Sequence, residues 1–238
     1  MCSSDLLAGS DMVIDCTVEG LLHAPELGQI LGGGARVLMI SNEHPDTYDR
    51  LGWDPALVPA VEAAHARMKA AAVMRATSEA GTDLTIRLAG AFTAGSVGLT
   101  DGPGSIAHWP GGLVLAFPAA HSVEGTVVLA PGDVNLTFGR YMESTVRLTI
   151  EDDHIVDIAG DGVDAALFRS YLSSFGDRES YATSHVGWGM NRHARWDALA
   201  LWDTRDLWGT EVRAFAGNFL YSTGANENAG RFTAGHFD

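Results

Sequence analysis

Short apolar runs separated by turn residues most constrain the fold of this chain, and their arrangement changes partway along it. The first part alternates strand signals with helix signals, at 12–17, 24–32, 36–42, 55–72 and 83–88. The strand runs are short and apolar, and the first helical stretch ends at the three consecutive glycines that follow Leu31. This β-α-β-α-β order predicts a partly parallel sheet flanked by helices.

Beyond about Gly95 the pattern becomes rich in short strands. Glycine and proline turns separate strand-like runs at 113–117, 126–129, 146–150 and 155–158. One amphipathic helix, 164–175, interrupts the strands and ends at Gly176. We therefore predict a mixed α/β (α+β) fold, with a βαβ-type domain at 1–95 followed by a β-rich domain at 96–238.

Composition excludes several classes of partner. The chain has 238 residues, a formal charge of −15 and a pI near 4.8, so its surface repels nucleic-acid phosphates and anionic membranes. No apolar run approaches the length of a membrane span, and the N-terminus lacks the basic and apolar regions of a secretory signal. Cys2 and Cys16 have neither metal-ligand nor redox spacing. These features predict a cytoplasmic protein that binds neither nucleic acid nor membrane.

The segment His236-Phe237-Asp238 carries the clearest chemical signal. In an extended strand, residues two positions apart project to the same side, so this imidazole and this carboxylate can reach one metal ion. His185, in a glycine- and tryptophan-rich stretch, can supply a third ligand. Two histidines and one carboxylate form the facial triad of non-haem Fe(II) oxygenases. A bare H-x-D is also common by chance, so the pair alone does not establish a metal site.

Several other catalytic signatures are absent. The glycines between 95 and 104 do not have the G-x-G-x-x-G order of a dinucleotide-binding loop, and the chain contains no P-loop. The motifs H-E-x-x-H and G-x-S-x-G are also missing. Zinc-protease and α/β-hydrolase interpretations therefore lose their usual support.

Four segments together resemble one enzyme family. They are 19–26, 125–135, 185–191 (His-Val-Gly-Trp-Gly-Met-Asn) and 226–238, which ends in His-Phe-Asp. In this order and at this spacing they resemble the 2,5-dihydroxypyridine 5,6-dioxygenases, whose scaffold is related to metallo-aminopeptidases of the aminopeptidase T type. The resemblance covers most of the chain. Members of that family are longer at both ends, so we expect this sequence to be a shortened form.

The resemblance implies a mononuclear Fe(II) enzyme in which His185, His236 and Asp238 bind the metal. It implies that 2,5-dihydroxypyridine and O2 are the substrates and that the ring opens between C5 and C6. The product is then N-formylmaleamate, formed during bacterial nicotine and nicotinate degradation. The resemblance also implies a homo-oligomer.

Further residues are candidates for substrate chemistry. His23 is our candidate acid–base group, because histidine titrates near neutral pH and this one lies between a predicted strand and a predicted helix. The family resemblance also implies a pocket histidine in this segment. His108, beside a Trp-Pro-Gly-Gly turn, is a candidate pocket wall, and Arg213 and Ser222 are candidate hydrogen-bond partners of the substrate. A helix-start role for His23 and a salt-bridge role for Arg213 stay open.

Two other functions stay open at this level. A metallo-aminopeptidase-like hydrolase on the related scaffold would hold two metals and need bridging carboxylates. Where such a glutamate is expected, this chain has Thr126, and 186–189 offers no carboxylate, so a single metal is favoured. A metal-free binding or structural protein would keep the fold and bind no iron.

Overall fold

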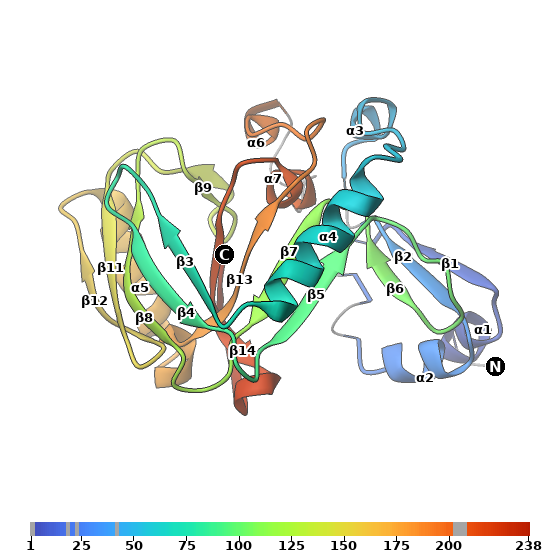
Figure 1. Cartoon of the computed structure of the whole chain (residues 1–238), viewed down its shortest axis with the longest axis horizontal. Helices are drawn as coiled ribbons and strands as arrows, with labels where there is room; N and C mark the ends of the chain where they lie inside the picture. The colour runs from blue at the N-terminus through green and yellow to red at the C-terminus, as the bar shows by residue number, and fades with distance from the viewer. Residues whose placement is uncertain (1–2, 18–19, 22–23, 41–42, 202–208) are drawn as a thin grey trace. The chain divides into compact units, whose positions relative to one another are not determined.

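A computed structural model of the chain describes residues 3–17, 20–21, 24–40, 43–201 and 209–238 (Figure 1). The chain forms two compact units, each assembled from separate stretches of sequence. Unit 1 comprises Met1–Glu62, Gly95–Leu113 and Gly189–Asn218, and unit 2 comprises Ala63–Ala94, Val114–Trp188 and Phe219–Asp238. The predicted division into 1–95 and 96–238 stays a prediction. The two units are defined by contacts between residues, whereas the predicted domains are continuous stretches of the chain.

Unit 1 is built on a three-stranded sheet in the order β1-β2-β6, and both strand pairs are parallel. Its elements are α1 (Ser3–Ala8), β1 (Met12–Asp15), α2 (Leu27–Gly32), β2 (Arg36–Met39) and β6 (Ile106–His108). Alternate residues of β1 and β2, namely Val13, Val37 and Met39, turn inward. They form one apolar core with Ile30 of α2 and with Ala35, the residue before β2.

The partly parallel sheet confirms the predicted fold class, but its third strand differs from the prediction. Residues 83–88 were expected to complete this sheet, and that expectation is wrong: β4 (Asp83–Arg87) pairs antiparallel in another sheet. The short strand β6, which lies beyond Gly95, takes its place beside β2. Three residues are too few to produce a recognisable periodicity, so the sequence pattern does not reveal this strand.

Short helices complete unit 1: α3 (Pro45–Arg50), α6 (Ala198–Leu201) and α7 (Thr210–Ala214). The guanidinium of Arg50 donates to both carboxylate oxygens of Glu211, at 2.5 and 2.7 Å. Because Glu211 is almost fully buried, this bidentate ion pair connects α3 to α7. The longer helix α4 (Leu57–Ala70) begins in unit 1 and continues into unit 2.

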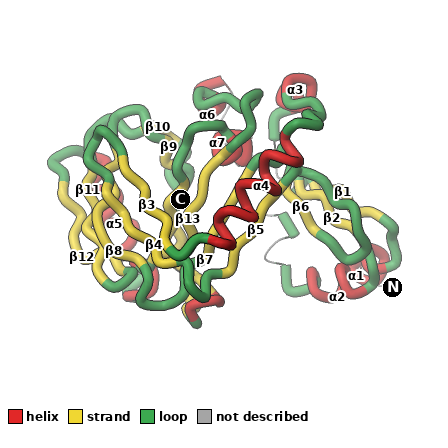
Figure 2. Tube along the Cα trace, viewed as in Figure 1, coloured by secondary structure: helices red, strands yellow, loops and turns green. Residues whose placement is uncertain are grey.

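The first sheet of unit 2 has five strands in the order β12-β11-β8-β4-β3 (Figure 2). All its neighbouring pairs are antiparallel. Besides β4, its strands are β3 (Val73–Thr77), β8 (Val123–Leu129), β11 (Val146–Glu151) and β12 (His154–Ala159). Strand β4 alternates, with Leu84 and Ile86 fully buried between exposed ends. This alternation is typical of an antiparallel sheet with one covered face.

The second sheet of unit 2 has the order β15-β14-β13-β7-β5. Its strands are β5 (Phe92–Ser96), β7 (Leu113–Phe117), β13 (Thr183–Gly189), β14 (Leu220–Asn226) and β15 (Arg231–Phe237). Also in unit 2 are the hairpin of β9 (Val134–Asn135) and β10 (Arg140–Tyr141), helix α5 (Val163–Ser174) and the 3₁₀ turns η1 (Arg178–Tyr181) and η3 (Glu227–Ala229). None of the described helices is both long and apolar enough to cross a membrane.

Candidate metal centre

Three antiparallel strands of unit 2 bring the predicted metal ligands together. His185 lies on β13, His236 lies on β15, and β14 runs between them. Opposite His236 the central strand carries Gly224, so no side chain stands there between the two outer strands. Continuing the same register by one step beyond the pair Thr223–Phe237 places Ser222 opposite Asp238.

The carboxylate of Asp238 lies close to both histidines. The carboxylate oxygens of Asp238 lie 3.7 Å from Nε2 of His185 and 3.6 Å from Nε2 of His236. The two imidazole rings are nearly parallel, with their centroids 6.1 Å apart. Hydrogen bonds are shorter, about 2.7 to 3.2 Å. Two ligand atoms that each lie about 2.1 Å from one ion are roughly 3.0 to 3.6 Å apart at right or trigonal angles. Asp238 therefore lies near each histidine at a spacing close to that of shared metal ligands, and two imidazoles with one carboxylate are a donor set that suits a single cation.

A bulge in β13 directs His185 into this site. The register between β13 and β14 shifts between Thr183 and Val186, and such bulges commonly re-aim a side chain next to an active site. Nδ1 of His185 lies 3.4 Å from Oγ of Ser184, which donates its own proton to the carbonyl of Ala225 at 2.6 Å. Ser184 can therefore accept from Nδ1, which puts the imidazole lone pair on Nε2, the atom facing Asp238.

The site is sheltered on one side and open on the other. The side chains of Asp238 and His185 are 11% and 16% exposed, whereas that of His236 is 52% exposed. The ring of Phe117 lies 5.2 Å from the ring of His185 and forms an aromatic wall beside it. A three-ligand face with an open side is what a facial triad needs to admit substrate and a small gas molecule.

The other predicted site residues are distributed over both units. His23 lies outside the described residues. His108 is partly buried on β6, and Arg213 is partly buried on α7, both in unit 1. Ser222 is fully buried on β14 in unit 2, next to the candidate ligands by strand register. The roles of these four residues toward a substrate stay predictions.

Unit 1 contains a buried carboxyl group that the sequence pattern does not single out. Glu43 is 7% exposed, and its Oε1 accepts a hydrogen bond from the backbone N–H of Glu211 at 3.2 Å. Burial, with the charge of Glu211 adding to it, raises the pKa of Glu43 to about 7, against the opposing effects of backbone hydrogen bonds and of Arg213. A lone glutamate in a loop gives no periodic or motif signal, so only the structure reveals this environment.

A second group of possible cation ligands, His121, Asp152 and Asp153, is held by protein contacts instead. Both oxygens of Asp153 accept backbone N–H groups of 121–123, at 2.5 to 2.8 Å, and one also pairs with Arg231 at 2.5 Å. Burial alone would raise the pKa of Asp153, but Arg231 and these N–H groups lower it overall. Since His121 and Asp152 are exposed and bonded to each other, we regard this group as structural.

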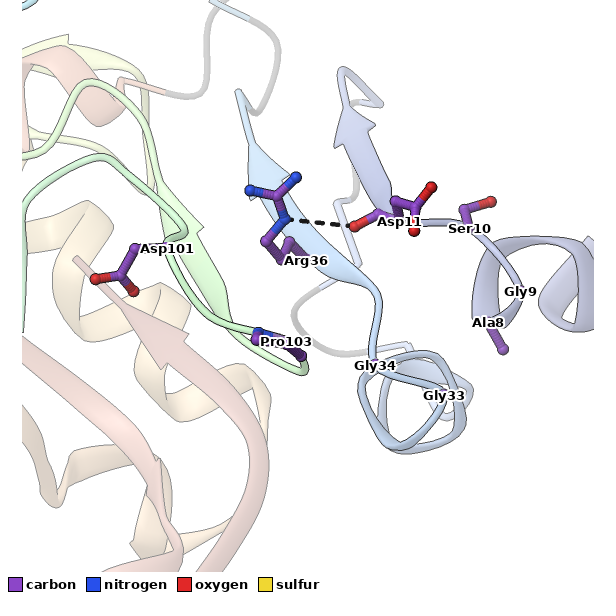
Figure 3. Close-up of a pocket in the computed structure, with 9 residues that line it drawn as sticks. All are labelled: Ala8, Gly9, Ser10, Asp11, Gly33, Gly34, Arg36, Asp101 and Pro103. Carbon is purple, nitrogen blue, oxygen red and sulfur yellow. Dashed lines mark hydrogen bonds between the residues drawn. The ribbon is translucent and has the colours of Figure 1, made fainter.

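A surface cavity of about 420 Å³ in unit 1 contains none of the predicted site residues (Figure 3). Its lining comes from the ends of α1 and α2, the starts of β1 and β2 and the loop before β6: Ala8, Gly9, Ser10, Asp11, Gly33, Gly34, Arg36, Asp101 and Pro103. The guanidinium Nε of Arg36 donates to the carbonyl of Asp11 at 3.5 Å. With one cation, two exposed aspartates and no aromatic wall, this lining does not suit an aromatic substrate.

Known proteins match both the sequence and the fold. The family profile of 2,5-dihydroxypyridine 5,6-dioxygenases matches residues 2–238. The chain is 38% identical over 234 residues to the 2,5-dihydroxypyridine 5,6-dioxygenase of Pseudomonas putida KT2440. This match covers 98% of this chain and 66% of that protein. The solved structure of 2,5-dihydroxypyridine dioxygenase from P. putida KT2440 matches with a TM-score of 0.91 at 38% identity, over 99% of this chain and 67% of that one.

A more distant solved structure, wild-type AmpT from Thermus thermophilus, matches with a TM-score of 0.56 at 13% identity. The match covers 99% of this chain and 72% of that one. At this identity the likeness shows the fold alone, and it agrees with the predicted relation to the aminopeptidase T scaffold. The chain spans 66% of the length of the curated relative that it matches. The family match extends over nearly all of this chain, and the chain belongs to the 2,5-dihydroxypyridine 5,6-dioxygenase family.

Proposed function

We propose that this chain is a mononuclear Fe(II) dioxygenase that opens the ring of 2,5-dihydroxypyridine between C5 and C6. The observation that carries the proposal is the meeting of His185, His236 and Asp238 in a chain of this family. The overall reaction joins one 2,5-dihydroxypyridine to one O2 and gives N-formylmaleamate, so no other oxidant is required. The same reaction would place the protein in nicotine or nicotinate degradation.

His185, His236 and Asp238 would hold the metal through two imidazole nitrogens and a carboxylate oxygen. A bound Fe(II) would supply the one-electron chemistry that ground-state O2 needs in order to react with a closed-shell aromatic ring. With a cation bound, the Asp238 carboxylate would offset part of its charge and the neutral imidazoles would leave the site net positive, which would favour a deprotonated ring hydroxyl. Phe117, beside His185, offers an apolar surface on which an aromatic ring can pack.

His23 is proposed as the base that accepts the proton of the ring hydroxyl, because its ordinary pKa suits proton transfer near neutral pH. Ser222, buried next to Asp238 by register, is proposed as a hydrogen-bond partner of the substrate. His108 and Arg213 are proposed as further substrate contacts. We also propose that the protein is cytoplasmic and forms a homo-oligomer, as the family resemblance implies.

Oxygen consumption by the purified chain tests this proposal. After anaerobic loading with Fe(II), addition of 2,5-dihydroxypyridine should consume one O2 per ring lost, followed by the ultraviolet absorbance of the substrate. His236→Ala should lower bound iron and reduce activity at least a hundredfold, because only two of the three proposed ligands would remain and would bind iron weakly. His121→Ala, in the structural His/Asp/Asp group, should leave both unchanged. Loss of iron in His121→Ala and retention in His236→Ala would contradict the assignment.

A further inference from the structure

The residue between the two candidate ligands of β15 acts as an anchor. Phe237 is 3% exposed, and its ring packs against the ring of Phe168 on α5, with the centroids 3.8 Å apart. The ring of Phe138, in the β9–β10 hairpin, meets Phe237 edge-on at 6.2 Å. Because side chains alternate along a strand, burying Phe237 on one face projects His236 and Asp238 together from the other.

The turn of the β9–β10 hairpin holds the backbone of Asp238 from both sides. The N–H of Asp238 donates to Oγ1 of Thr137 at 2.9 Å. In return, the carbonyl oxygen of Asp238 accepts from the N–H groups of Leu136 and Thr137, at 2.9 and 3.2 Å. Oγ1 of Thr137 also donates to this carbonyl at 3.5 Å, so the hairpin turn fixes the position of Asp238, which directly follows the end of β15 at Phe237.

Helix α5 supplies the remaining contact. The hydroxyl of Tyr171 donates to the carbonyl of His236 at 2.7 Å. The Tyr171 ring also meets the ring of Phe138 edge-on at 5.5 Å, so the helix and the hairpin support each other. Helix α5 and the β9–β10 hairpin, which are distant in sequence from β15, thus both contact the segment 236–238.

We propose that Thr137, Phe138 and Tyr171 form a clasp, a set of positioning residues that holds His236 and Asp238 in the geometry required to bind metal. This inference rests on the proposed metal centre and adds the groups that determine its affinity. The clasp touches the backbone of the ligand segment and the side chain of Phe237, so it acts through the ligands and not on the substrate. Groups that orient metal ligands typically change metal affinity by about 10- to 100-fold when they are removed.

Titration of the metal-free protein with Co(II), followed by the visible absorption of the bound ion, tests the clasp without any assay of ring cleavage. Thr137→Val removes the acceptor of the Asp238 N–H but keeps the side-chain shape, and it should raise the Co(II) dissociation constant about tenfold or more. Thr137→Ser retains the hydroxyl and should restore near wild-type affinity. Tyr171→Phe removes only the bond to His236 and should weaken binding by a smaller factor. The thermal midpoint of each metal-free variant reports whether the fold is intact.

Two control variants show whether a loss of Co(II) affinity is specific to the clasp. Thr77→Val in β3 and Tyr181→Phe in η1 make the same chemical changes elsewhere in unit 2 and should leave Co(II) affinity unchanged. Weaker binding in Thr137→Val with recovery in Thr137→Ser supports the clasp. Unchanged affinity in both Thr137→Val and Tyr171→Phe would overturn it while leaving the proposed metal centre standing. If the wild-type chain binds no Co(II), the metal centre itself is wrong, and the clasp falls with it.

Discussion

At the scale of single residues, two buried carboxyl groups have pKa values shifted in opposite directions. Asp153 has Arg231 and three backbone N–H donors, which lower its pKa despite burial. Glu43 is buried beside Glu211, a like charge, and its pKa is raised to about 7. Burial disfavours the charged form in both cases, so the partners decide the sign. Neither residue type nor sequence position indicates those partners, and for that reason both environments had to come from the structure.

The raised pKa of Glu43 makes the stability of the protein depend on pH. Between pH 4.5, the ordinary value for a glutamate, and about pH 7, folded Glu43 keeps its proton while the unfolded residue loses it. Its stabilising contribution is therefore complete below pH 4.5 and is lost as the pH rises through about 7, a change of at most about 3 kcal/mol.

Glu43→Gln should remove this dependence, so that the free energy of unfolding in urea falls less between pH 5 and pH 8 than in the wild type. The exposed Glu62→Gln in α4 is the matched control and should keep the wild-type slope. An identical pH slope in Glu43→Gln and wild type would contradict the shifted pKa.

At the scale of secondary-structure elements, the candidate metal centre depends on glycine in the strand between its ligands. Gly224 on β14 has a φ of +116°, which L side chains rarely adopt. A Cβ at this position would lie 2.2 Å from the carbonyl oxygen of Gly235, the residue before His236. Both the backbone conformation and the close approach therefore require glycine.

Gly224→Ala should displace β15 from β14, destabilise the fold by about 2 kcal/mol or more, and weaken metal binding together with it. Gly28→Ala is a suitable control, because nothing lies within 4 Å of the added Cβ and the position is helical. The comparison requires thermal midpoints and Co(II) affinities of both variants. A Gly224→Ala protein with wild-type stability and affinity would show that β14 and β15 do not need this close contact.

Elements with clear periodicity were predictable from the sequence, and those set by long-range pairing were not. The run 113–117 forms β7 as predicted, and the amphipathic helix at 164–175 is α5 within one residue at each end. By contrast, the partners of a strand depend on residues far away along the chain. The sequence therefore predicts a parallel sheet but not β6 as its third strand. The bulge in β13 and the clasp on β15 likewise arise from neighbours that no local pattern encodes.

At the scale of the whole molecule, the family assignment rests on agreement between motif spacing, sequence identity and fold. The candidate ligands are about fifty residues apart in sequence and belong to two strands separated by a third. The sequence separation of these ligands therefore predicts a function only through the family resemblance. The structure explains why such distant residues lie close together, because the order of the strands brings β13 and β15 to either side of β14. The net charge of −15 disfavours a polyanionic partner.

The fate of oxygen atoms tests the central claim most directly. The Fe(II)-loaded chain should be mixed with 2,5-dihydroxypyridine under ¹⁸O2 in ordinary water, and the product examined by mass spectrometry after a brief reaction. A ring-cleaving dioxygenase places both atoms of one O2 in the product, so N-formylmaleamate carrying two labelled oxygens is the predicted result. A ring-opened product that contains oxygen from water and none from ¹⁸O2 would show hydrolytic chemistry and contradict the account.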